Sequence, residues 1–247
     1  MFIMIMMAAV CLFTLVAARN RKIIVDVGAN CGDSYKKLMR EHPQHSNDDN
    51  TEIHLIEANP LLMKHLTKIA AEDHRVRVYP YAVSANNTGT SATFTIYYGK
   101  SMERFDDQDI SQMSCNDNSL TTGSLSDGIY RHGGKLYKVS ENGESNLRKR
   151  KSRKVTVKAV NLRDWLRTLE LDKSDNVILK IDVEGTEFAL LEQIMSDTDL
   201  FCLIGTWHVE FHMKTRLALL SSDKEEAIRT SFFSKVRSCG AIFGEWD

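Results

Sequence analysis

The chain has 247 residues and a formal net charge of -1, and at this length a single α/β domain can bury one large core. Because acidic and basic residues balance, no overall field draws the chain towards nucleic acid, and we do not expect a DNA or RNA substrate.

The N-terminal residues are strongly apolar. Residues 2–18 carry no charged side chain and stand at the lower limit of a bilayer-spanning helix, which needs about 17–25 residues. The small triplet V-A-A that ends at Ala18 suits signal-peptide cleavage, whereas the basic residues from Arg19 onward follow the run and would hold an uncleaved domain in the cytosol. We favour a signal peptide over residues 1–18, and hence a secretory or membrane-associated protein. A membrane anchor with a cytosol-facing domain, or a misassigned start, remains open.

The segment from Ile23 to Ser34 has the pattern of a buried strand, a glycine turn and a helix start. Gly28 and Gly32 allow a sharp turn and a close approach to a ligand. Asn30 stands where a dinucleotide-binding G-x-G-x-x-G has its middle glycine, and the third glycine is missing, which disfavours NAD and FAD. Asp26 would repel a phosphate but suits a ligand with an amino group and a sulfonium, as in S-adenosylmethionine. Taken alone, the segment could also be an ordinary strand-to-helix turn.

The second predicted strand also ends in an acid. Within Thr51 to Pro60 a short apolar run precedes Glu57, and the proline begins a helix that extends over residues 61–71. In α/β nucleotide folds this position supplies the acceptor for ribose hydroxyls. We therefore predict that Glu57 binds the ribose of the cofactor.

The middle of the chain changes character. Residues 75–79 are the predicted third strand, and residues 90–98 alternate like an extra strand or hairpin arm. Residues 100–154 are rich in Ser, Asn, Asp and Gly, end in a basic run, and are too long for a simple connection. We interpret this insertion as a solvated surface segment, with a substrate-covering segment as the alternative. The sequon at Asn86 could carry a glycan only in the secretory lumen.

Acidic residues and histidines end the strands of the last third. The sheet is predicted to resume over residues 155–160 and a short helix to follow over residues 162–169. A buried strand from Val177 then ends in the carboxylates of D-V-E-G-T-E, before an amphipathic helix. A strand over residues 201–211 would place His208, Glu210 and His212 on one face by alternation. In an open α/β sheet that rim binds ligands, although a solvated strand end is the alternative. A closing helix over residues 221–236 and a strand over residues 241–246 complete the prediction.

The five cysteines are scattered along the chain. They show neither C-x-x-C nor a spacing typical of zinc. We predict no disulfide framework, and we interpret Cys31, inside the glycine turn, as a small side chain in a crowded position.

Three of these segments together resemble a known family. V-D-V-G-A-N-x-G, I-E-A-N-P and, most specifically, L-K-I-D-V-E-G-T-E are similar to the FkbM-type S-adenosylmethionine-dependent methyltransferases. The resemblance covers roughly residues 22–212 with one long interruption. It implies a methyltransferase domain over residues 21–247 with a class I methyltransferase-like α/β fold, a doubly wound, mostly parallel sheet with helices on both faces. It also implies O-methylation of sugar or polyketide hydroxyls, and an adenine bound near Ala82 and Val83. The predicted cofactor-binding residues are Asp26, Gly28, Asn30, Gly32, Glu57, Asn59, Ala82 and Val83.

The predicted function is S-adenosylmethionine-dependent methylation of a hydroxyl on a small molecule or glycan. Such an in-line displacement requires the acceptor to be aligned in a dry cleft and benefits from a base. The candidate catalytic residues are Asp182, Glu184, Glu210 and His212. Asp182, Glu210 and His212 could instead hold a divalent metal such as magnesium. A non-catalytic, secreted or membrane-tethered binding module on the same fold is the alternative function, against which the retained glycines and acids argue.

Overall fold

The computed structural model describes residues 19–85, 91–97, 152–183, 185–212 and 222–246, and three short strands at 123–124, 129–132 and 135–138. The leader, the sequon at Asn86 and most of the insertion at 100–154 lie outside these residues, so the predictions made for them stay predictions. Within the described part of the chain, no helix has the length and apolarity needed to cross a membrane.

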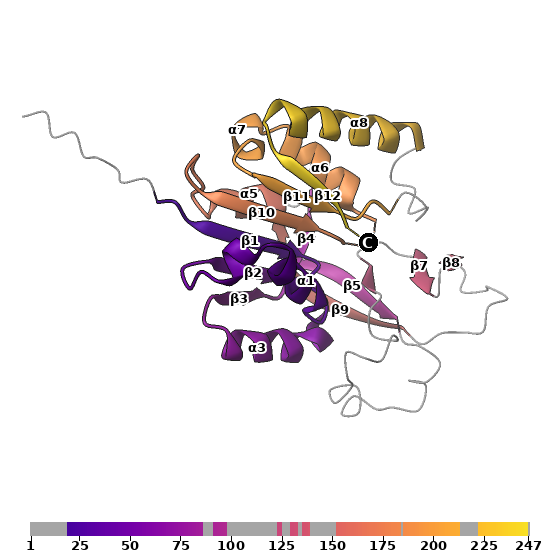
Figure 1. The fold of residues 1–247 in the computed structure, drawn as a ribbon. Coiled ribbons are helices and arrows are strands. Elements are labelled where there is room, and N and C mark those ends of the chain that lie inside the picture. Colours follow the sequence, from indigo (N-terminus) through magenta and orange to yellow (C-terminus); the bar gives the residue numbers. More distant parts are fainter. Residues whose placement is uncertain are drawn as a thin grey trace, which may run out of the picture.

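Six parallel strands form the central sheet, in the order β12-β11-β10-β1-β2-β3. Their bounds are β1 (Lys22–Val27), β2 (Glu52–Ile56), β3 (Val76–Tyr79), β10 (Asn176–Ile181), β11 (Thr206–Val209) and β12 (Ile242–Glu245). The chain begins in the middle of the sheet, builds one half outward to β3, and returns to place β10 beside β1 (Figure 1). This is the doubly wound order, in which ligands bind beyond the carboxyl ends of β1 and its returning neighbour. The predicted fold class is confirmed.

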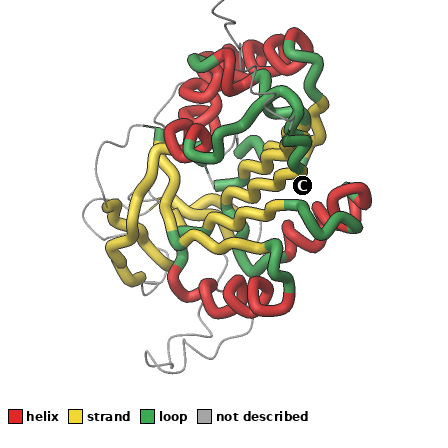
Figure 2. Tube along the Cα trace, turned by 90° about the vertical axis from the view of Figure 1, so that its left-hand side faces the viewer, coloured by secondary structure: helices red, strands yellow, loops and turns green. Residues whose placement is uncertain are grey.

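Helices cover both faces of this sheet, as Figure 2 shows with the strands between two helical layers. On one face lie α1 (Asp33–Glu41), α2 (Pro43–Ser46), the 3-10 turn η1 (Pro60–Leu62) and α3 (Met63–Glu72); on the other lie α5 (Leu162–Arg167), α6 (Glu187–Met195), α7 (Thr198–Phe201) and α8 (Ser222–Ser238). A hydrophobic core lies on each face of the sheet, and successive strand residues point alternately into one core and the other. Ile24 packs with Leu38 of α1, whereas Val25 belongs to the core of Trp207 and Phe232. The near-continuous apolar strands follow from burial on both faces.

A second sheet corrects the predicted course of the middle of the chain. Its strands are β4 (Tyr81–Ser84), β9 (Ser152–Asn161), β5 (Ser91–Tyr97) and β6 (Gly123–Ser124), in the order β4-β9-β5-β6. The extra strand predicted over residues 90–98 is confirmed. Residues 155–160, however, do not rejoin the central sheet, because β9 pairs with β4 and β5. Pro80 separates β3 from β4, and since proline has no N–H to donate to a sheet, it marks the point where the chain changes sheet.

The predicted insertion contains regular structure. β7 (Ile129–His132) and β8 (Lys135–Lys138) form an antiparallel pair, and β6 pairs with β5. β9 begins at Ser152, so the last residues assigned to the insertion belong to the second sheet.

The strand predicted over residues 201–211 is wrong in its first half. Phe201 ends α7, and Asp197 caps that helix by accepting the Leu200 N–H. β11 begins only at Thr206 and ends at Val209. The aromatic and apolar residues that suggested a longer strand are buried because the short helix packs into the same core.

The prediction of no disulfide is also wrong. Cys202, just after α7, is bonded to Cys239, just after α8, with 5.1 Å between the Cα atoms. Cys31 is disulfide-bonded as well, so it is not merely a small packing residue. Cys202 and Cys239 are 37 residues apart and meet only because α7 and α8 pack together, which no spacing rule reveals.

Candidate active site

The glycine turn after β1 and the acidic segment after β10 lie against each other. The Asp182 N–H donates to the Val27 carbonyl at 3.1 Å. Gly28 has a φ of 79°, and a Cβ built there would lie 1.8 Å from the carbonyl oxygen of Asp182. Gly32 has a φ of 87°, and its Cβ would lie 2.2 Å from Ile69 Cδ1 of α3. Gly28 therefore requires glycine for both conformation and space, whereas Gly32 requires it for its left-handed conformation, since the end of the Ile69 side chain can move.

Glu57 joins the two loops that follow β1 and β2. Its Oε2 accepts the Asn30 N–H at 2.9 Å, and its Oε1 accepts the Asn59 N–H at 2.7 Å. Burial raises the pKa of Glu57, against the effect of these two N–H donors. A carboxylate has about four acceptor sites, so Glu57 can still receive ligand hydroxyls. Asn59 in turn caps η1, because its side chain accepts the Leu61 N–H.

Asp26, a predicted cofactor-binding residue, makes its contacts within the fold. Its side chain is fully buried, lies 3.1 Å from Lys180 Nζ, and accepts the Ser34 hydroxyl. Lys180 also donates to the Gly28 carbonyl at 2.7 Å and lies 3.3 Å from Asp182 Oδ2. Burial opposes the charge of Lys180, but the two carboxylates outweigh it, so its pKa is raised. Asp26 thus pairs with Lys180, its partner in the strand register.

The His212 ring lies between two carboxylates and close to Asp182. His212 Nδ1 is 2.8 Å from Glu187 Oε1, and His212 Nε2 is 3.1 Å from Glu210 Oε1. Glu187 is fully buried and also accepts the Gly185 N–H at 2.9 Å. Ligand atoms of Asp182, Glu187 and His212 all lie within 4.8 Å of one another. The His212 ring therefore links the buried Glu187 to the partly exposed Glu210.

A comparison with protein families matches residues 26–240 to the Methyltransferase FkbM domain. The chain belongs to the FkbM methyltransferase family. Neither a search of curated proteins nor a search of solved structures gave a match. The matched residues include the glycine turn after β1, Glu57 and the second sheet. They also include the cluster of Asp182, Glu187, Glu210 and His212. The suspected resemblance is therefore confirmed over nearly the whole chain.

Within the FkbM domain, three of the four predicted catalytic residues come together. Asp182, Glu210 and His212 lie at the carboxyl end of the central sheet, while Glu184 lies outside the described residues. The predicted alternation of His208 with Glu210 and His212 is wrong, because strand geometry ends at Val209. His208 contacts His42 instead.

Two functional residues were missed, and both stand inside L-K-I-D-V-E-G-T-E. Lys180 is a charged residue in an otherwise apolar strand, and Glu187 is a charged residue at the start of an apolar helix. A charged residue on an otherwise apolar, buried strand or helix indicates a partner of opposite charge or a hydrogen-bond network. Both residues could therefore have been predicted from the sequence.

The predicted adenine-binding residues contribute mainly to packing. Ala82 and Val83 are buried in β4 and pair with Ala159 and Val160 of β9. Their side chains fill the core, which leaves their backbone groups as the means of contacting a ligand.

The predicted metal set fits a divalent cation poorly. Lys180 already places a positive charge 3.3 Å from Asp182. The residues whose ligand atoms lie close together are Asp182, Glu187 and His212, a set that does not include the predicted Glu210. Glu187 Oε1 contacts His212 Nδ1, and both carboxylate oxygens of Glu187 accept the Gly185 N–H.

Proposed function

We propose that this FkbM methyltransferase uses S-adenosylmethionine to methylate a hydroxyl group on a small molecule or glycan. Methyl transfer follows from the family, whereas the methyl donor and the acceptor class are the proposal. The observation that carries it is the position of Asp182. Its carboxylate is 24% exposed, lies beside the glycine turn, and stands next to the His212–Glu210 pair at the point where the strand order reverses.

The site's residues have separate roles in this proposal. The cofactor supplies an electrophilic methyl group on a sulfonium. The turn at Gly28 allows the backbone to approach it, and Glu57 accepts ribose hydroxyls. Asp182 takes the proton of the acceptor hydroxyl, and since burial raises the pKa of this carboxyl against the opposing effect of Lys180, it is a better base than a solvated aspartate.

Glu187 is a positioning residue. It receives backbone N–H groups from Val183 and Gly185 and holds His212 by its Nδ1. This fixes the segment that carries Asp182 relative to Glu210. Such positioning matters because small misplacements of reacting groups lower the rate of displacement reactions steeply.

The test is a pair of calorimetric titrations, with S-adenosylmethionine and with NAD, followed by radiolabelled methyl transfer to a panel of glycosides and other hydroxylated compounds. We expect stoichiometric binding of S-adenosylmethionine, none of NAD, and label in an alkali-stable ether. Amine or carboxylate acceptors would overturn the acceptor class. A folded protein that binds no S-adenosylmethionine would overturn the proposal and favour a non-catalytic binding module.

We further propose that the domain matures in an oxidising compartment, as a secreted or membrane-associated protein. The Cys202–Cys239 disulfide supports this location, because disulfides persist in secreted proteins and are rare in the cytosol. Mass spectrometry of protein from a eukaryotic secretory host should find Arg19 as the first residue, a glycan on Asn86 and no free thiol at either cysteine. An intact leader together with reduced Cys202 and Cys239 would instead favour an anchor with a cytosol-facing domain.

A further inference from the structure

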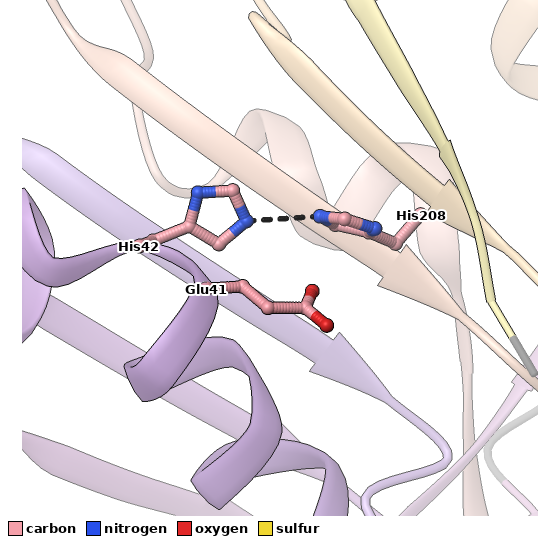
Figure 3. Close-up of side chains that lie close together, drawn as sticks. All are labelled: Glu41, His42 and His208. Atoms are coloured by element: carbon pink, nitrogen blue, oxygen red, sulfur yellow. Dashed lines mark hydrogen bonds between the residues drawn. The ribbon is translucent and has the colours of Figure 1, made fainter.

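A second cluster of histidine and carboxylate lies where the end of α1 meets β11. Figure 3 shows Glu41 at the end of α1, His42 directly after it, and His208 in the strand, with the two rings directed at each other. The two Nε2 atoms are 2.9 Å apart. A ligand atom from each of the three residues lies within 4.8 Å of the others. We propose that Glu41, His42 and His208 bind one zinc ion.

The spacing suits tetrahedral coordination. Zinc–nitrogen bonds of about 2.0–2.1 Å at tetrahedral angles place two imidazole nitrogens roughly 3.3 Å apart. The rings therefore need to separate by only a few tenths of an ångström to admit the ion between them. Glu41 is exposed, so its carboxylate can turn to become the third ligand, and water can take the fourth position.

The strand holds the His208 ring in place before any ion arrives. The ring is 7% exposed, and its Nδ1 lies against Gly244 of β12, where an added Cβ would be only 2.6 Å away. Trp246 packs edge-on against the same ring at 5.2 Å between centroids. Since the other side of the ring is occupied in this way, Nε2 is directed towards His42. A ligand whose rotamer is fixed by packing binds metal with less loss of entropy.

The charges around the cluster are compatible with a cation. A metal ion binds imidazole through a nitrogen that carries no proton, and the two Nε2 atoms that face each other, from His42 and His208, are the candidates for this. From α1, Glu41 contributes a negative charge and Lys37 a positive one, but the Lys37 ammonium lies over the Trp246 ring at 4.1 Å. His45, from α2, meets His42 edge-on at 6.0 Å between ring centroids.

The ion would join two segments that are 166 residues apart. Because α1 begins directly after the glycine turn at Gly32, the helix would be fixed at its start by that turn and at its end by zinc. The proposed role is to link α1 to β11, and the site is separate from the cluster of Asp182, Glu187 and His212.

The test titrates zinc chloride into protein first treated with a chelator, in competition with a chromophoric chelator, and follows the melting temperature. Wild type should bind one equivalent and melt at a higher temperature with zinc, since an ion that binds only the folded state stabilises it. His42→Ala should weaken binding by more than the roughly 10–100-fold that follows loss of a residue supporting a ligand. His42 is chosen because it is partly exposed, and Glu41→Gln should have a smaller effect in the same direction.

The matched control is His74→Ala, which removes an exposed histidine elsewhere and should leave zinc affinity unchanged. Cobalt in place of zinc should give the visible absorption of a tetrahedral site in wild type, a readout that needs no variant to fold. Absence of stoichiometric zinc binding by folded wild type would overturn the proposal. Binding that survives His42→Ala but is lost in His212→Ala would overturn it too, and would assign the ion to the other cluster.

Discussion

Charged residues at the end of the central sheet fall into two groups that are close in space but differ in exposure. Asp26 and Lys180 are fully buried and neutralise each other within the sheet. The side chains of Asp182 and Glu210 stay 24% and 31% exposed. The difference comes from register, because Asp26 and Lys180 lie opposite each other inside β1 and β10, while the other two follow the last strand residue. Charge inside the sheet is paired within the fold, whereas charge just beyond it stays partly accessible to solvent.

Asp182→Asn tests the exposed group and should have the largest effect. We expect the methyl-transfer rate to fall by roughly 10²–10⁴-fold, the contribution of a positioned base, with affinity for S-adenosylmethionine nearly unchanged. Single-turnover transfer and calorimetry measure the two quantities. Glu226→Gln, on the exposed side of α8, is the matched control and should keep the wild-type rate. Full turnover in Asp182→Asn would leave Glu210 and His212 as the candidate bases.

Lys180→Met tests the buried group. Removing the ammonium leaves the Asp26 carboxylate buried and unpaired, which costs about 3–5 kcal/mol of unfolding free energy. Urea denaturation measures this, and Lys36→Met, an exposed lysine on α1, should change stability by less than about 0.5 kcal/mol. The double variant with Asp26→Asn should recover part of the loss, because the unpaired charge is then gone. If Lys180→Met were as stable as wild type, the buried pair would not stabilise the fold.

The sequence was sufficient for the parts of this comparison that depend on local pattern. The turn at Gly28 and Gly32 and the acid at Glu57 follow from residue type and spacing, because a strand, a glycine and a helix start are neighbours in the chain. The α/β class follows from the alternation of apolar strands with helices, whereas the doubly wound sheet was expected from the family resemblance and is observed in the structure.

What could not be predicted depends on tertiary register. Whether the Asp26 carboxylate pairs with a lysine depends on which residue of β10 lies beside it. The apolar pattern of either strand alone does not determine that register. His208 was grouped with His212 because alternation was extended beyond Val209, where the strand ends. The Cys202–Cys239 bond likewise depends on how two helices pack.

His54 extends the comparison to a buried histidine on β2. Burial, with smaller contributions from Arg77 and Arg21, lowers the pKa of His54 to about 4, against about 6.5 in an unfolded chain. Below about pH 6.5, His54 is therefore protonated in the unfolded chain. In the folded protein it stays neutral until the pH approaches about 4. Stability should fall by about 3 kcal/mol as the pH drops from 6.5 to 4.

Unfolding free energies measured across this pH range in wild type and His54→Gln check the prediction. The variant should lose that part of the slope, although it is less stable at pH 7 because the contact of His54 Nδ1 with the Tyr79 hydroxyl at 3.0 Å is altered. His74→Gln, at an exposed position, should keep the wild-type slope. Equal slopes in all three proteins would show that His54 is not held neutral by burial.

Glu57 lies between the two groups, since it is buried and joins the loops at Asn30 and Asn59 yet stands where a ribose would bind. Glu57→Gln keeps the size of the side chain but removes a charged acceptor worth about 1.5–3 kcal/mol, so affinity for S-adenosylmethionine should weaken by roughly 10–100-fold. Calorimetry measures the affinity, and Asp182→Asn serves as the control because it should bind the cofactor normally. Methylthioadenosine and its 2′-deoxy analogue separate the two roles. If Glu57 accepts the ribose hydroxyl, wild type should discriminate between these compounds and Glu57→Gln should not. If Glu57 only joins the loops, the variant should bind both compounds more weakly by the same factor, and Glu57 would then belong with the buried group.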